Sequence, residues 1–349
     1  MRNFKLKLGV IALINAALLG CGGGGGGGSS GNDSGAAGSG STSAGNSGAS
    51  FSAITQANYE TVAATVTDPV GELTNLNSAT GLITSGVEVD AAPLSLATAS
   101  TQIYKRFSAK GAQLVTGATY TEACSRGGSV TVNESVVSDS KLTAGDRLTI
   151  SANNCAEDDL PALNGTLSIT INAVSGDPVN SSRYSLDMTS TFGNLTMSSG
   201  ARRVLIDGDL KISATQNGGS DISVGLSGSR LSLSIAQSGT QTNAYTLADF
   251  NLSGTQTATS TSLAGSYTLS GTSSRLGAYS YRVQTVRPVV VSGSGSFVSA
   301  GSLLITGTPA TVTVTSLDGT MLRLDYSANG DGIVTANSTL TRSQFEALN

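Results

Sequence analysis

Apolar and polar residues alternate along most of the chain from residue 123 onward, and this alternation constrains the fold more than any other feature. In the segments 163–173 and 204–214, every second position is apolar, one glycine in each apart, and most positions between them carry polar groups. Successive side chains of a strand point to opposite faces, so this pattern indicates strands with one buried and one solvent-facing side. We therefore expect a mainly β fold, a large curved antiparallel sheet that forms a sandwich or an open barrel.

Turn signals and changes of phase divide the alternation into strands. Three short sequences tolerate the positive φ of tight turns: Asn217-Gly218-Gly219, Asp318-Gly319 and Asn329-Gly330. The apolar parity changes at three places, which predicts bulges or tight turns there: between Leu226 and Leu231, near Asp249-Phe250 and near Thr285-Val286. A phrase recurs as GTLSIT, GSYTLS and GSLLIT, but its first glycines, Gly165, Gly265 and Gly301, are spaced too irregularly for a β-solenoid.

One short amphipathic helix is expected at the start of the folded part. Apolar residues recur at helical spacing from Ile54 to Val66; Ser52 can cap this segment and Asp68-Pro69 can end it. Strand-like pieces follow at Gly81–Val89 and Gln113–Tyr120. We divide the folded part into residues 51–122, the helix plus strands, and residues 123–349, the antiparallel β domain.

The first 20 residues have the features of a targeting segment. A basic start precedes Leu8–Leu19, an apolar run of 12 residues that only Asn15 interrupts. A bilayer-spanning helix needs about 20 apolar residues, whereas the core of a secretory signal is shorter. We therefore expect residues 1–20 to be a signal peptide.

The end of that segment, Leu18-Leu19-Gly20-Cys21, resembles the lipobox of bacterial lipoproteins. The resemblance implies cleavage before Cys21, lipidation of its sulfur and acylation of its new amine. It also implies an outer-membrane destination, because Gly22 replaces the aspartate that signals inner-membrane retention. Whether the protein faces the periplasm or the cell surface stays open. The alternative to lipidation is an ordinary signal peptide with a chance cysteine.

Residues 21–50 are expected to form a flexible tether behind the lipidated cysteine. Residues 22–50 are almost all Gly, Ser, Ala, Asn and Thr, with Asp33 the only charged residue. Such a composition buries too little surface to offset its ordering entropy. A coil of this length has a root-mean-square reach of roughly 30 Å. The membrane, through the lipid anchor, is thus the first expected partner.

Charge excludes nucleic acid as a partner. Loss of Arg2, Lys5 and Lys7 with the signal peptide lowers the basic residues from 19 to 16, against 23 acidic ones. Nucleic-acid binders need clustered Lys and Arg. The only adjacent basic pairs are Lys105-Arg106 and Arg202-Arg203.

Few residues offer catalytic chemistry. The chain contains no histidine, the commonest general base and the usual zinc ligand. Ser138 and Lys141, the nearest match to a Ser-Lys dyad, lie in a predicted turn. Asp207 and Asp209 are candidates for a carboxylate pair such as glycosidases use, but a surface charge pattern is the simpler explanation. We expect no catalytic residue, no cofactor and no enzymatic activity.

Two further cysteines are expected to form a disulfide, since export through the envelope exposes them to an oxidising compartment. The segments Gly127–Asn133 and Asp146–Asn154 have the pattern of a hairpin. A turn centred near Asp139-Ser140 would place Cys124 opposite Cys155; two free thiols are the alternative. The block from Cys124 to Thr170 resembles β-rich, uncharacterised lipoproteins of proteobacteria, a likeness that implies no activity.

Two acidic segments resemble metal sites only superficially. Glu134, Asp139 and Asp146 are too sparse for a calcium loop. The segment Ser327–Ser338 has the centre of an EF-hand loop, but serine occupies its first and twelfth positions, and the twelfth requires a bidentate carboxylate. We expect a hairpin turn there and no metal site.

Two classes of function remain. The first is a structural or interaction module at the cell envelope, adhesion-like, displayed on the tether to a protein or surface partner. The second is a carrier that holds a lipid or another apolar ligand on an open apolar sheet face. A set of aromatic residues would distinguish the two classes. If a second sheet or the N-terminal helix covers them they are core, and if they line an open groove they are a binding site. They are Tyr245, Phe250, Tyr267, Tyr279, Tyr281 and Phe297.

Overall fold

A computed structural model describes twelve stretches of the chain. They are residues 51–74, 119–135, 137, 142–156, 162–178, 181–199, 202–219, 221–237, 240–257, 260–273, 275–292 and 298–348. The predicted signal peptide and tether, the segment Gly81–Val89 and most of Gln113–Tyr120 lie outside these residues, as do Cys21 and Phe297.

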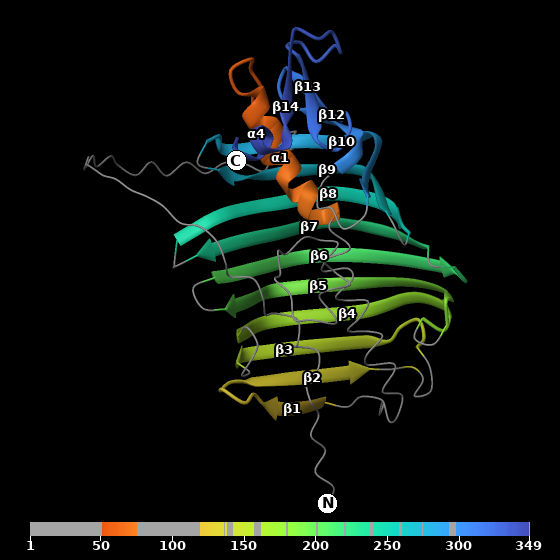
Figure 1. Cartoon of the computed structure of the whole chain (residues 1–349). Helices are drawn as coiled ribbons and strands as arrows, with labels where there is room; N and C mark the ends of the chain where they lie inside the picture. Colours follow the sequence, from red (N-terminus) through yellow and green to blue (C-terminus); the bar gives the residue numbers. More distant parts are fainter. Residues whose placement is uncertain are drawn as a thin grey trace, which may run out of the picture.

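The described residues form one sheet of 14 strands in which each strand pairs only with its sequence neighbours (Figure 1). All 13 pairings are antiparallel. The strands are β1 (Thr119–Ala123), β2 (Ser129–Ser135), β3 (Arg147–Cys155), β4 (Ala162–Gly176), β5 (Arg183–Ser199), β6 (Arg202–Asn217), β7 (Ile222–Gln237), β8 (Thr240–Gln256), β9 (Ser260–Ser273), β10 (Gly277–Ser292), β11 (Val298–Thr306), β12 (Thr311–Ser316), β13 (Met321–Ser327) and β14 (Ala336–Thr341). The fold class is confirmed as mainly β.

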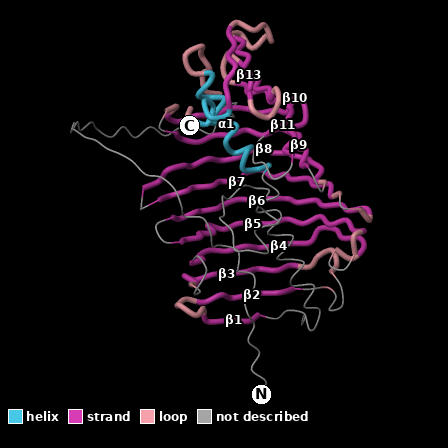
Figure 2. The backbone as a smooth tube through the Cα atoms, in the orientation of Figure 1, coloured by secondary structure: helices cyan, strands magenta, loops and turns pink. Residues whose placement is uncertain are grey.

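Of the two predicted architectures, the open one is present. β1 and β14 are the two edges of a single sheet, and no second sheet packs on it among the described elements. The short strands β12 to β14 run steeply to the long strands β4 to β7, so the sheet turns as it proceeds (Figure 2). Its turns carry the predicted glycines: φ is +90° at Gly218, +80° at Gly319 and +68° at Gly330.

The predicted N-terminal helix exists, but both its bounds were wrong. The helix α1 spans Tyr59–Thr74. Ser52 does not cap it, because Ser52 is bonded to β10: its backbone N donates to Ser280 O at 2.8 Å, and its Oγ accepts from Ser280 N at 2.9 Å. Asp68-Pro69 does not end it either, because the turns before the proline are held by packing: Val62, Ala63 and Val66 are fully buried.

The core lies on one face of the sheet, and α1 packs against part of it. The helix contacts β9 to β13, and the rings of Tyr59 and Tyr326 stack with centroids 5.4 Å apart. A second helix, α4 (Arg342–Glu346), follows β14 and places Phe345 in the same core. The alternation predicts this face well, since Leu167, Ile169 and their counterparts on the strands β5 to β13 are buried.

A line of β-bulges crosses the sheet. Every neighbouring pair from β3–β4 to β10–β11 contains a shift of register. Shifts or skipped pairings coincide with the three predicted parity changes, which are therefore bulges and not turns. A bulge bends its strand and increases the local twist, which accounts for the turning of the sheet.

Glycines with positive φ lie opposite these bulges. Gly165, Gly208, Gly265 and Gly301 have φ between +109° and +151°. A Cβ on any of them would lie 2.1 to 2.5 Å from a carbonyl oxygen of the neighbouring strand. Three of them begin the recurring phrase, and Gly208 begins a fourth copy, GDLKIS, that the sequence analysis missed. The phrase therefore marks where a strand faces a bulge.

Candidate functional site

Cys124 and Cys155 lie at disulfide distance, with Cα atoms 5.4 Å apart. The predicted pairing is thus present, but the hairpin register behind it was wrong by three residues. Ser129 pairs with Asn153 and Ser135 with Arg147, which centres the β2–β3 hairpin near residue 141. Cys124 still meets Cys155 because it lies in the β1–β2 turn, where Arg126 N donates to Ala156 O at 2.9 Å and ties this turn to the end of β3.

The carboxylates of Asp207 and Asp209 accept hydrogen bonds from the bulges of the strands on either side of β6. Asp207 Oδ1 accepts from the backbone N of Asn194 on β5 at 3.1 Å. Asp209 accepts from the backbone N and the hydroxyl of Ser229 on β7, at 3.0 and 2.6 Å. The two side chains thus accept hydrogen bonds from neighbouring strands on opposite sides of β6, which is a structural use of each.

The acidic segments form turns whose N–H and O–H groups donate hydrogen bonds to the acidic side chains. Asp146 is buried and accepts from the backbone N of Val137 at 2.7 Å and of Thr143 at 2.8 Å. The predicted hairpin turn after β13 is present, because Tyr326 pairs with Ala336 on β14. Within it, Asp331 accepts from Ile333 N at 2.9 Å and from Ser327 Oγ at 3.0 Å. These hydrogen bonds hold the pKa of Asp331 below its usual value.

Glu134 was predicted to lie in the hairpin turn, and the structure places it inside β2 instead. It shares the buried face with Val130 and Val132, and only 7% of its surface is exposed. Burial raises the pKa of its carboxyl above 4.5, because the charged form loses hydration there. The period of two from Val130 onward would have revealed this position.

We expect the contribution of Glu134 to the free energy of unfolding to decrease as the pH rises. The folded state favours the protonated acid, so the carboxyl of the unfolded chain loses its proton at a lower pH, near 4.5. The free energy of unfolding therefore decreases as the pH rises from that value to the raised pKa of the folded state. Glu134→Gln should remove this part of the pH dependence and should be more stable than the wild type at pH 7. Urea titrations at pH 4 and pH 7 measure it; equal pH dependence in both proteins would contradict the assignment.

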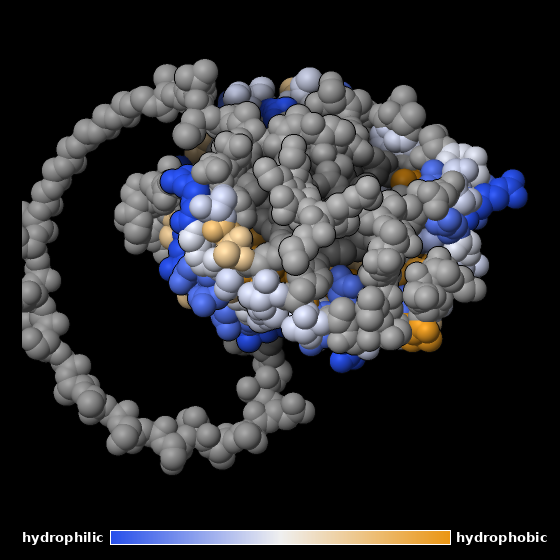
Figure 3. Space-filling model, turned by 90° about the horizontal axis from the view of Figure 1, so that it is seen from below, coloured by the Kyte–Doolittle hydropathy of each residue, from blue (hydrophilic) through white to orange (hydrophobic). Residues whose placement is uncertain are grey.

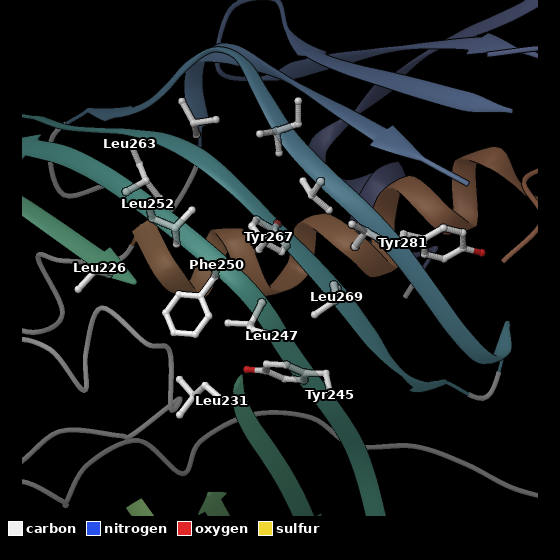
Figure 4. Close-up of a cluster of buried hydrophobic side chains, with 14 of the residues drawn as sticks. Leu226, Leu231, Tyr245, Leu247, Phe250, Leu252, Leu263, Tyr267, Leu269 and Tyr281 are labelled. Atoms are coloured by element: carbon white, nitrogen blue, oxygen red, sulfur yellow. The ribbon is translucent and has the colours of Figure 1, made fainter. Parts of the chain in front are cut away.

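The aromatic set lies on the apolar face, and its described members are buried. Tyr245, Phe250, Tyr267, Tyr279 and Tyr281 are at most 9% exposed. Figure 4 shows Phe250 among leucines of β7 and β8, with α1 passing beside Tyr267 and Tyr281. Tyr267, Tyr279 and Tyr281 lie on β9 and β10, which α1 contacts, so by the criterion set from the sequence they are core. Tyr245 and Phe250 lie on β8 and are also buried.

Three buried hydroxyl groups of the described residues on this face have no hydrogen-bond partner. They belong to Tyr267 on β9, to Ser190 on β5 and to Ser338 on β14, which pairs with Leu324. Ser190 is fully buried and sits opposite Ile169 on one side and Leu210 on the other. Burial raises the pKa of the Tyr267 phenol far above its usual value. An unpaired buried hydroxyl costs free energy, so these three positions are unsatisfied polar groups on a largely apolar face. The sequence pattern marked only Tyr267.

Other features of a site are not found among the described residues. No group of three or more Asp, Glu, Cys or His side chains able to hold a metal ion occurs there. None of the helices in the described ranges is long and apolar enough to cross a membrane. Among the described residues that are visible from below, apolar ones form small separate spots (Figure 3). Ser138 and Lys141 lie outside the description.

No family model, no curated protein and no solved structure matches the chain.

Proposed function

We propose that this protein is a non-enzymatic lipoprotein of the cell envelope, anchored to the outer membrane through Cys21, whose sheet is a structural or interaction module. The single observation that carries the proposal is the sequence around Cys21, an apolar run that ends in LLGC and is followed by a glycine-rich segment. Two or more acyl chains anchor a protein stably to a bilayer, whereas one does so only marginally.

The use of the carboxylates supports a non-catalytic role. Asp146, Asp207, Asp209, Asp318 and Asp331 each accept hydrogen bonds from backbone N–H groups of turns or bulges. A catalytic carboxylate must instead reach a substrate and have a pKa tuned to its task. These five groups stabilise the irregular backbone of a long sheet, which suits a scaffold.

The tether suits a module that meets its partner near the membrane. A coil of roughly 30 Å reach keeps the folded part at high local concentration without fixing its orientation. Long strands rich in Ser and Thr offer a broad hydroxylated face with hydrogen bonds between neighbouring strands, such as Thr149 Oγ1 to Ser168 Oγ at 3.1 Å. Such a surface suits contact with a protein or another surface.

Lipidation of Cys21 is the decisive test. Metabolic labelling with a fatty-acid probe should mark the wild type, and Cys21→Ser should lose the label and leave the outer-membrane fraction. The double variant Cys124→Ala and Cys155→Ala is the matched control, since both sulfur atoms lie in the folded part, and it should label as the wild type does. Equal labelling of the wild type and Cys21→Ser would remove the basis of the proposal.

A carrier of lipid or another apolar ligand is the second candidate. The unpartnered hydroxyls of Tyr267 and Ser190 favour it, because a ligand with a polar group would satisfy them on an otherwise apolar face. Stoichiometric lipid extracted from the purified protein, and reduced in Tyr267→Phe and Ser190→Ala, would establish the carrier. Its absence, with no turnover on ester, peptide or glycoside panels, would leave the interaction module.

A further inference from the structure

The β13–β14 turn presents two adjacent aliphatic side chains to solvent. Ile333 is 67% exposed and Val334 is 46% exposed. Ile333 has the largest exposed fraction among the large apolar side chains that the structure describes. Single exposed aliphatic residues are common on protein surfaces, so exposure alone does not identify a contact site.

The turn holds these side chains outward by its own hydrogen bonds. Asp331 accepts from Ile333 N at 2.9 Å on one side of the pair. Thr335 N donates to Tyr326 O at 2.8 Å on the other side, and Thr335 Oγ1 accepts from Ala328 N at 3.2 Å. A preorganised turn loses little conformational entropy when its tip binds.

The turn lies beside the point where the tether joins the folded part. Ser52, two residues after the tether's predicted end, accepts through its backbone O from Thr308 N at 3.1 Å. Pro309 follows, and its carbonyl oxygen lies 2.7 Å from the position of a Cβ on Gly330 in the turn. Figure 1 shows the same neighbourhood: the orange start of the described chain lies next to the dark blue turn at the top of the molecule.

We propose that Ile333 and Val334 insert into the surface of the bilayer to which the tether is anchored. The segment 327–338 contains no basic residue and one acidic residue, Asp331, so the contact is apolar and does not depend on anionic lipids. Two aliphatic side chains bind a bilayer weakly by themselves, but a tether that raises the local concentration makes a weak contact sufficient to orient the sheet. The anchor of the proposed function explains why a membrane is near; the contact itself is tested without it.

Tryptophan fluorescence provides the test, because the chain contains no tryptophan. The probe is the chain from residue 21 onward, with Cys21→Ser to exclude lipidation and Ile333→Trp as the only indole. Vesicles of phosphatidylcholine and phosphatidylethanolamine, added at millimolar lipid to replace the high local concentration that the anchor provides, should shift its emission to shorter wavelength, and brominated acyl chains should quench it. Ile333→Ser with Val334→Ser should weaken vesicle binding by about tenfold, as expected for the loss of two partly inserted aliphatic side chains.

Leu317→Trp is the matched control, because Leu317 is 48% exposed in the turn at the opposite end of β13. Its emission should not change with vesicles. All three side chains substituted in the folded part, Ile333, Val334 and Leu317, are exposed, so the thermal midpoints should match that of the parent chain and exclude misfolding. Unchanged emission from Ile333→Trp, or an equal shift from Leu317→Trp, would overturn the proposal. Neither result bears on lipidation of Cys21, which the labelling experiment tests separately.

Discussion

Gly208→Ala is expected to destabilise the sheet by about 3–5 kcal/mol, at the upper end of the range for single substitutions. The added Cβ would lie 2.2 Å from the carbonyl oxygen of Arg230 on β7, and the glycine has φ of +128°. The backbone of β6 or β7 must move to relieve this contact, which lies in the middle of both strands. Urea unfolding followed by circular dichroism measures the free energy of unfolding.

Gly127→Ala separates the steric contact from backbone strain. Gly127 has a similar φ of +117°, but nothing lies within 4 Å of its Cβ position. Its substitution should cost only about 1–3 kcal/mol, the cost of the unfavourable φ. Equal losses in the two variants would show that the bulge opposite Gly208 does not need close approach of the strands.

Removal of the Cys124–Cys155 link is expected to lower the free energy of unfolding by about 3–4 kcal/mol. The two residues are 31 apart in sequence, and a cross-link of this span restricts the unfolded chain by about that amount in the chain-entropy model. The double variant Cys124→Ala and Cys155→Ala, compared with the wild type under oxidising conditions, measures the effect by urea titration.

Reduction provides the control for that comparison. Reductant should lower the stability of the wild type towards that of the double variant and should leave the variant unchanged. Peptide mapping without reductant should recover the two cysteines in one cross-linked fragment. Recovery of both as free thiols would show that the pair is not oxidised in the isolated protein.

Local sequence determined the strands and the buried face. The alternation in 163–173 and 204–214 predicted which side chains lie in the core, because a strand has a side-chain period of two whatever its neighbours are. The changes of parity located the bulges for the same reason, since an inserted residue shifts that period by one. Turn glycines were equally visible, because positive φ is a property of a single residue.

The pairing of residues that are distant along the chain was harder to predict from the sequence. The β2–β3 register was predicted three residues away from its observed value, because the hairpin pattern does not state where its turn begins. The start of α1 was predicted too early, because Ser52 bonds to Ser280, a residue 228 positions away. Asp207 and Asp209 took their roles from bulges on the two neighbouring strands, which no local pattern describes.

The amino-acid sequence by itself determined that this protein is built from long amphipathic strands behind a glycine-rich segment. The tertiary structure alone decided that these strands form one open sheet rather than two packed sheets. It also decided that bulges or skipped pairings on neighbouring strands lie beside one another. The physical reason is that periodicity is set within a strand, whereas layering depends on what covers the apolar face. Here α1 lies over β9 to β13, where its small buried residues pack closely against the sheet.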